Sequence, residues 1–342
     1  MTSYPVTTQD WGNYRLFQLR NAQDMRVLIS DLGATLVSWH APDRSGRLAD
    51  ILLGHAGPEG YENNGPYFGS QVGRWANRIR DGRFTLDGVP YQVDRNQGGQ
   101  HHLHGGHAGF HQQVWAVAAS DGGLVFSLQS AEGEAGFPGT LRVEVRYSLD
   151  DDGTLRMDYQ AVSDAPTPIS LTAHPYFNLN GGEADIGDHL LQIAADQYLQ
   201  VDESLIPVAR CAVAGSAFDF LQPAPIGARL AWPDGQLAIA GGFDHCYCLN
   251  GGTQALRPVA EVYDPTSGRE LRVSTTEPGL QFYSGNFLDG AEGRRRYRAH
   301  DGFCLEAQRY PDQVNGPDAE AAILRPGQRY QQTTCYRLGV RR

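Results

Sequence analysis

The chain has 342 residues, of which 41% are hydrophobic and 20% charged, proportions typical of a globular protein with a buried core. Its formal net charge of −11 makes nucleic acid and anionic membrane surfaces unfavourable partners, because both repel an acidic protein. The N-terminus lacks a signal-peptide pattern and no run of about 18 apolar residues occurs, so we predict a cytoplasmic protein without a membrane partner.

The cysteine and lysine contents exclude several kinds of chemistry. The five cysteines are an odd number and are widely spaced, so the sequence predicts no disulfide framework. Cys246 and Cys248 lack the C-x-x-C spacing of zinc sites, and we interpret them as buried thiols. The chain contains no lysine, which excludes Schiff-base chemistry, a pyridoxal phosphate anchor and a P-loop.

The predicted elements, taken in chain order, are nearly all strands. Residues 140–149 ("TLRVEVRYSL") and 154–162 ("TLRMDYQAV") alternate apolar and polar side chains, and Asp152-Gly153 between them predicts a hairpin turn. Similar runs, separated by Gly, Pro, Asp and Asn, occur at 25–29, 35–39, 91–93, 114–120, 124–130, 190–195, 260–264, 270–276, 280–285 and 335–340. Helical periodicity is nearly absent, and no linker or repeat is visible. We therefore predict an all-β fold, a large antiparallel sandwich or barrel, as a single domain over residues 1–342.

The first candidate site is the segment 96–111 ("NQGGQHHLHGGHAGFH"). Its five histidines are His101, His102, His104, His107 and His111. His102 and His104 form an H-x-H pair, but no Asp or Glu follows before Asp121, so the sequence favours no metal site. Gly105 and Gly106 predict a tight turn that brings His104 close to a ligand, and we interpret the other four histidines as solvated or capping residues.

Three more stretches place reactive side chains among apolar neighbours. They are "LTAHPYFNLN" with His174, "GGFDHCYCLN" with Asp244 and "GFCLEAQRYPD" with Glu306. Burial would raise the pKa of Glu306 toward the range of a useful general base. Taken singly, each of the three is more typical of a structural residue, and a functional interpretation depends on their lying close together in the fold.

These stretches resemble the aldose 1-epimerase, or galactose mutarotase, family. The matching motifs occur in the family's order: "GRWANRI" (73–79), "HHLHGGHAGF" (101–110), "LTAHPYFNL" (171–179), "LQIAADQYLQVDESLIPV" (191–208), "FDF" (218–220), "FDHCYCL" (243–249), "LQFYSGNFLDG" (280–290) and "GFCLEAQRYPDQVN" (302–315). The resemblance implies a large antiparallel β-sandwich, the galactose mutarotase-like supersandwich, with a sugar cleft on one face. It implies an isomerase that interconverts the α and β anomers of free aldohexoses such as galactose and glucose.

Matched motif by motif, the resemblance also implies roles for individual residues. Glu306 would be the general base, His174 the general acid, and His104 would assist at the ring oxygen of the sugar. The residues implied to hold the sugar hydroxyls are Asn77, Arg78, His104, Tyr176, Asp244 and Gln281. One departure from some relatives is Pro175, which stands where they have Ser and removes a backbone donor beside His174.

This chemistry needs only two proton transfers, one from the C1 hydroxyl and one to the ring oxygen, so we expect no cofactor and no metal. The expected partner is a small aldose, with the protein as a monomer or homodimer. Alternatives are a hexose-6-phosphate 1-epimerase that uses the arginines of "GRRRYR" (293–298) as a phosphate clamp, a glycosidase with Asp244 and Glu306 as its carboxylates, and a non-catalytic sugar-binding module. We interpret "GRRRYR" as a solvated loop, and a glycosidase leaves His104 and His174 without a role.

Overall fold

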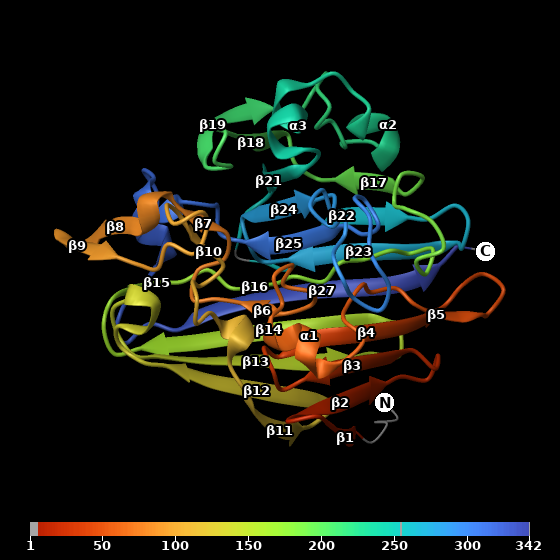
Figure 1. The fold of residues 1–342 in the computed structure, drawn as a ribbon, viewed down its shortest axis with the longest axis horizontal. Coiled ribbons are helices and arrows are strands. Elements are labelled where there is room, and N and C mark those ends of the chain that lie inside the picture. The colour runs from red at the N-terminus through yellow and green to blue at the C-terminus, as the bar shows by residue number, and fades with distance from the viewer. Residues whose placement is uncertain (1–5, 254, 342) are drawn as a thin grey trace.

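The computed structural model describes residues 6–253 and 255–341, and strands dominate it (Figure 1). The three large sheets are antiparallel throughout. The α-helices of the described residues are short: α1 (Pro58–Glu62), α2 (Ile226–Leu230) and α3 (Gly235–Ala240). None of these helices is long and apolar enough to cross a membrane. The predicted all-β class is confirmed.

The largest sheet has nine strands and extends across the whole molecule (Figure 1). Its strands, in spatial order, are β11 (Ala116–Ser120), β12 (Gly123–Ser130), β13 (Leu141–Leu149), β14 (Thr154–Ser163), β27 (Tyr330–Val340), β23 (Arg269–Thr275), β22 (Arg257–Tyr263), β17 (Leu190–Ile193) and β20 (Ala224–Pro225). The C-terminal strand β27 lies in the middle of this sheet and joins an N-terminal half to a C-terminal half.

Two five-stranded sheets pack against the two halves of the large sheet, which makes the molecule a sandwich. The first contains β1 (Thr7–Trp11), β2 (Tyr14–Arg20), β3 (Arg26–Ser30), β4 (Thr35–Pro42) and β5 (Leu48–Asp50). The second contains β19 (Pro207–Ala212), β18 (Gln197–Val201), β21 (Asp244–Cys248), β24 (Gly279–Tyr283) and β25 (Cys304–Gln308). Phe17 of the first sheet packs edge-on against Phe126 of the large sheet, and Tyr336 of the large sheet donates a hydrogen bond to the Leu305 carbonyl of the second.

Four two-stranded ribbons and five 3₁₀ turns connect these sheets. The ribbons pair β7 (Arg78–Ile79) with β10 (His102–Leu103), β8 (Arg83–Leu86) with β9 (Val89–Gln92), β6 (Gln71–Val72) with β16 (Thr172–Ala173), and β15 (Thr167–Pro168) with β26 (Ile323–Leu324). The 3₁₀ turns span Arg80–Gly82, Phe110–Gln112, Glu134–Gly136, Gln313–Asn315 and Ala319–Ala322. The short ribbons carry the loops that surround the cleft described below.

The hairpin predicted from alternation is β13 and β14, and its burial follows the sequence pattern. Along β13 buried and exposed residues alternate from Leu141 to Tyr147, because successive side chains of a strand point to opposite faces. On β14, Leu155, Met157 and Tyr159 are buried as expected. The alternation therefore identified both the strands and the face of the sheet that covers the core.

The main hydrophobic core is one cluster of buried residues. Its members range in sequence from Phe17 to Leu338 and come from all three large sheets. This shared core packs the three large sheets against one another. Trp39 and Trp115 lie fully buried in this core, and Trp75 is fully buried in a smaller cluster with Ile79 and Phe84.

Candidate active site

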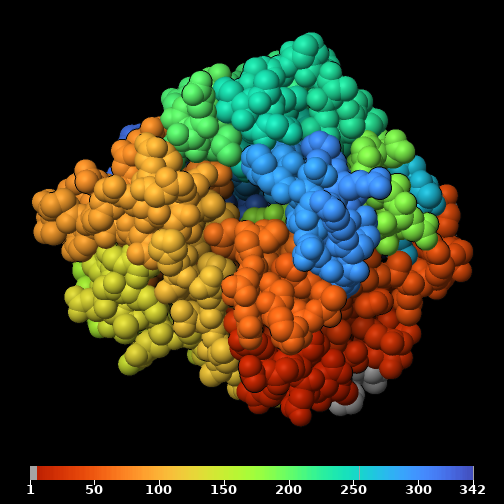
Figure 2. Space-filling view, viewed as in Figure 1, coloured from red at the N-terminus to blue at the C-terminus, as the bar shows by residue number. Residues whose placement is uncertain are grey.

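A cleft of about 250 Å³ opens on one face of the molecule, ringed by segments that are far apart in the sequence (Figure 2). Seven of the eight residues singled out from the sequence line it: Asn77, Arg78, His104, His174, Tyr176, Asp244 and Glu306. The eighth, Gln281, is buried beside the cleft and donates a 2.6 Å hydrogen bond to Asp244 Oδ1. The structure therefore brings all eight residues together.

The second five-stranded sheet forms the base of the cleft. On β25 the side chains of Leu305 and Ala307 belong to the core, so Glu306, between them, points to the opposite face. The strand register places Gln281 directly opposite Glu306, and Asp244 lies on the next strand, opposite Tyr283. Strand alternation and register thus carry the carboxylates to the cleft side of one sheet.

Two loops contribute the residues on the other side, and both have unusual backbones. Asn77 and His104 have left-handed φ values of 64° and 51°, which are uncommon for residues other than glycine and concentrate at functional sites. The pairing of β7 with β10 holds the loops together, with Arg78 opposite Leu103. Gly105 has a φ of 92°, and an added Cβ would lie 1.8 Å from the Gly73 carbonyl oxygen. The predicted glycine turn is confirmed, and a larger residue would be excluded there.

His104 is held as a hydrogen-bond donor. Its Nδ1 accepts a 3.2 Å hydrogen bond from the backbone N–H of Asn77. Burial, reinforced by the nearby His174 and Arg78, lowers the pKa of His104 well below its usual value, so the ring is neutral and its single hydrogen is on Nε2. His104, His174 and Glu306 bring ligand atoms within 4.8 Å of one another, a set that a metal ion can use. A metal needs a ring lone pair, however, and that of His104 is engaged by the backbone.

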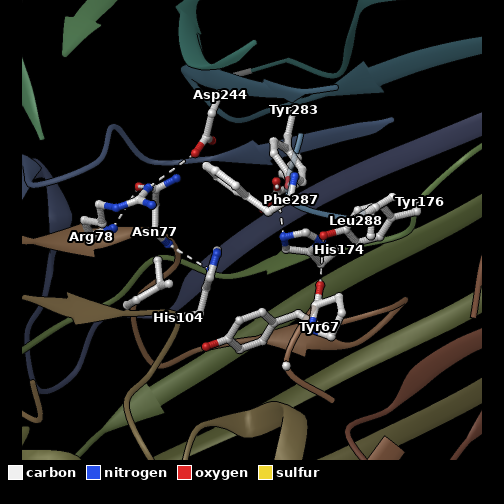
Figure 3. A pocket seen from close by; sticks show the side chains of 14 residues that line it. Tyr67, Asn77, Arg78, His104, His174, Tyr176, Asp244, Tyr283, Phe287 and Leu288 are labelled. Carbon is white, nitrogen blue, oxygen red and sulfur yellow. Dashed lines mark hydrogen bonds and ion pairs between the residues drawn. The ribbon is translucent and has the colours of Figure 1, made fainter. Parts of the chain in front are cut away.

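His174 lies beside the rings of Tyr67 and Tyr176 (Figure 3). Its ring stacks on Tyr176 at 5.1 Å and on Tyr67 at 5.9 Å, with interplanar angles of 29° and 28°. Its Nε2 lies 3.6 Å from Oε1 of Glu306. Both side chains are nearly inaccessible, and among the described residues no hydrogen-bond donor contacts the second carboxylate oxygen of Glu306. The pair is therefore largely shielded by the protein, and Oε2 of Glu306 is available to a ligand.

Burial shifts the two pKa values in opposite directions. It raises the pKa of Glu306 well above its usual range, with a further increase from the Asp244 charge that Arg78 opposes. It lowers the pKa of His174 to about 4. Burial thus disfavours a separated carboxylate and imidazolium, so the two groups are coupled through a shared proton. A carboxyl and an imidazole that share one proton suit general acid and base catalysis.

Charged and polar groups gather on the far side of the cleft from His174 (Figure 3). Arg78 lies 3.8 Å from Asp244 and donates a 2.9 Å hydrogen bond to Gln97. Together with Asn77 and Gln281, these groups present donors and acceptors suited to vicinal hydroxyls. Tyr176 also lines the cleft; its hydroxyl donates to the Pro66 carbonyl and its ring stacks on His174.

Two of the other four histidines of segment 96–111, His102 and His111, contradict the interpretation as solvated or capping residues. His102 and His111 are buried, and only His107 is exposed. His101 is buried as well, although its Nδ1 accepts from the Asp81 backbone N–H, as a capping residue does. The solvated interpretation fails because the segment packs onto the 3₁₀ turn at 80–82 and the loop around Asp94, to whose carbonyl the ring of His102 bonds.

The arginine-rich stretch at 293–298 does not line the cleft. Arg294 donates to the Leu52 carbonyl and pairs with Asp50, and Arg295 pairs with Asp301. Arg294 thus anchors its loop to the first five-stranded sheet. Among the described residues, the cleft lining contains one arginine, Arg78, which is held within the hydroxyl-binding group.

Sequence reasoning missed three aromatic residues of the cleft, Tyr67, Tyr283 and Phe287. Tyr67, with a φ of 61°, packs against His104 and His111 as well as His174. Phe287 is 65% exposed at the cleft and stacks on Tyr283. Phe287 falls in the quoted motif at 280–290, so its aromatic character was visible, but Tyr67 sits in a loop where no periodicity signals burial.

The chain matches known proteins over nearly its whole length. The family model "Aldose 1-epimerase" matches residues 15–337. Galactose mutarotase of Rattus norvegicus is 45% identical over 334 residues, which cover 96% of this chain and 95% of the relative. Aldose 1-epimerase of Escherichia coli K12 is 39% identical over 338 residues, covering 97% of each chain.

Solved structures agree with these matches. Galactose 1-epimerase of Lactobacillus acidophilus superposes with a TM-score of 0.87 at 29% identity, covering 99% of both chains. An aldose epimerase homologue from C. elegans gives a TM-score of 0.87 at 27% identity over 96% of this chain and all of the other. The chain therefore belongs to the aldose 1-epimerase family and is an isomerase that interconverts the anomers of aldoses.

Proposed function

We propose that Glu306 and His174 are the proton-transfer pair of this reaction, that His104 donates a hydrogen bond to the ring oxygen, and that the preferred substrates are free aldohexoses such as galactose and glucose. The observation that carries the proposal is the 3.6 Å approach of His174 Nε2 to Glu306 Oε1, two buried side chains that line the cleft. The partner is a single small sugar, which suits a cavity of about 250 Å³.

The reaction balances with these groups alone. A base takes the proton of the C1 hydroxyl, the C1–O5 bond breaks, and an acid protonates O5, which gives the open-chain aldehyde. After rotation about C1–C2, O5 attacks the other face of C1, and the same two groups return the protons. The group that is the base in ring opening is thus the acid in closure, and the other group does the reverse, so no net proton is gained or lost. His104 stabilises charge on O5 because its Nε2–H is fixed as a donor.

The pH profile should be bell-shaped, with an acid limb well below the usual range of histidine. The pair works while it holds one proton. As the pH falls through about 4, His174 binds a second proton and no base is left. As the pH rises through the raised pKa of Glu306, the last proton leaves and no acid remains. The limbs report the pair as a whole. Anomer exchange measured by NMR between pH 3 and 10 tests this, and loss of half the rate already near pH 6.5 would contradict it.

Arg78→Ala and Asp244→Asn should weaken sugar binding more than turnover. A hydrogen bond to a charged group contributes about 1.5–3 kcal/mol, so KM should rise roughly 10- to 100-fold. Asparagine keeps the volume of Asp244 and limits the cost of leaving Arg78 unpaired. Arg80→Ala is the matched control, since Arg80 pairs with Asp202 and does not line the cleft. Calorimetric galactose affinities equal to wild type in both variants would refute these binding roles.

The proposed specificity for free sugars rests on the number of positively charged side chains in the cleft. A phosphate would need a cationic clamp, but the arginines at 294 and 295 pair with aspartates and do not line the cleft. Polarimetry of fresh α-D-galactose, α-D-glucose and α-D-glucose 6-phosphate, each with and without protein, tests the proposal. Faster mutarotation of the two free sugars alone is expected. Catalysis of the phosphosugar at a similar or higher rate would favour the hexose-6-phosphate 1-epimerase instead.

A further inference from the structure

The thiol of Cys304 contacts the catalytic histidine from behind the cleft. Cys304 begins β25 and points to the same side of the sheet as Glu306, two residues along. It is fully buried and is not among the residues that line the cavity. Its Sγ lies 3.5 Å from Nδ1 of His174. The thiol therefore reaches the ring nitrogen that faces away from Glu306, in a place where a bound sugar does not touch it.

The role implied for His174 requires one particular tautomer. A neutral imidazole carries one hydrogen, and the partner of one ring nitrogen decides which nitrogen keeps it. Nε2 is the nitrogen next to Glu306, so it must be free to accept and return a proton. Nδ1 must then hold its hydrogen throughout the cycle, and a buried N–H needs an acceptor. The sulfur of Cys304 lies 3.5 Å from Nδ1; a thiol can donate or accept, and with the hydrogen on Nδ1 the sulfur accepts.

The two stacked tyrosines cannot select this tautomer. Tyr67 and Tyr176 fix the plane of the His174 ring, but a stack permits the ring to flip within that plane. Only a partner at the ring edge distinguishes nitrogen from carbon. Burial raises the pKa of the Cys304 thiol well above its usual value, so the partner stays neutral and adds no charge to the pair. The sulfur is thus an acceptor that orients the ring without adding a charge.

We propose that Cys304 is a positioning residue that holds His174 with its hydrogen on Nδ1, in the opposite tautomer to His104. In His104 the backbone donates to Nδ1 and makes Nε2 a permanent donor. In His174 the thiol accepts from Nδ1 and leaves Nε2 free for exchange. One imidazole is therefore a fixed donor and the other a proton carrier. This inference rests on the proposed function, because it assumes that His174 transfers the proton.

The test compares Cys304→Ala, which removes the acceptor, with Cys304→Ser, which restores one of similar size. Loss of a partner that orients a functional histidine typically costs 10- to 100-fold in activity, so kcat of Cys304→Ala should fall by roughly that factor while KM stays within about twofold. Cys304→Ser should recover most of the loss. Cys248→Ala is the control, since it removes a buried thiol of the same sheet that packs on Leu199 and Tyr310. Its kcat should equal wild type.

A spectroscopic readout separates tautomer control from packing. Multiple-bond ¹H–¹⁵N spectra of the wild type, with His174 identified by its absence in His174→Asn, should show hydrogen on Nδ1 and none on Nε2. Cys304→Ala should show a mixture. The proposal is overturned by hydrogen on Nε2 in the wild type, by wild-type kcat in Cys304→Ala, or by equal losses in the Ala and Ser variants. If instead His174→Asn and Glu306→Gln retain wild-type exchange, the proposed function itself fails.

Discussion

Glu306→Gln should lower kcat roughly 100- to 10,000-fold while sugar affinity stays within about an order of magnitude. Glutamine nearly matches the shape of glutamate and still forms hydrogen bonds to a hydroxyl, but its amide neither takes up nor gives a proton near neutral pH. Because Glu306 lies in the base of the cleft with its pKa raised by burial, this proton transfer is the function that the substitution removes. Saturation-transfer NMR of anomer exchange on the folded variant measures the rate.

Glu277→Gln is the matched control for that experiment. Glu277 is also fully buried, and burial raises its pKa too, but its carboxylate accepts from Tyr330 and lies 3.7 Å from Arg309. It does not line the cleft, so its variant should turn over sugar within about twofold of wild type. Near-wild-type exchange in Glu306→Gln would remove Glu306 from the mechanism and leave Asp244 as the carboxylate of the reaction.

The fold was predictable because the strands are amphipathic. Where one face of a strand covers a core and the other meets solvent, burial reproduces the alternation of the sequence, as in β13 and β14. Nothing local distinguishes a sandwich from a barrel, however. That choice depends on which sheets pack together, and here on the insertion of the C-terminal strand β27 between β14 and β23.

The site was predictable only in part from the residues themselves. Taken singly, His174, Asp244 and Glu306 each looked like structural residues. They form a site because the register of β21, β24 and β25 places the two carboxylates side by side. A loop 130 residues before β25 then brings His174 to them. The family resemblance supplied that convergence. The histidines at 102 and 111 were misjudged for a related reason, since a run of glycine and histidine looks solvated until a distant segment packs over it. Tyr67 was missed because its left-handed backbone conformation, which turns the loop at this position, cannot be predicted from a tyrosine in the sequence.

His174→Asn should show a loss of kcat similar to that of Glu306→Gln, again about 100- to 10,000-fold. Asparagine can form hydrogen bonds but cannot carry a proton. It also removes a ring that stacks between Tyr67 and Tyr176, so part of the loss could come from a collapsed cleft. His174→Phe answers this objection, because it keeps an aromatic ring in the stack. Both variants should be equally slow, and galactose affinity should stay within about tenfold in each.

The double variant Glu306→Gln/His174→Asn should be little slower than either single variant. Opening the ring needs a base and an acid in the same event, so once one partner is lost the other has no proton exchange to complete. The remaining acceleration would come from the His104 donor and from binding, which both single variants and the double variant retain. The measurement is the anomer-exchange rate of the two single variants and the double variant, each compared with the uncatalysed sugar, as a double-mutant cycle. If the two single effects multiply in the double variant, Glu306 and His174 act independently. That result would contradict the proposal that they act as one proton-sharing pair.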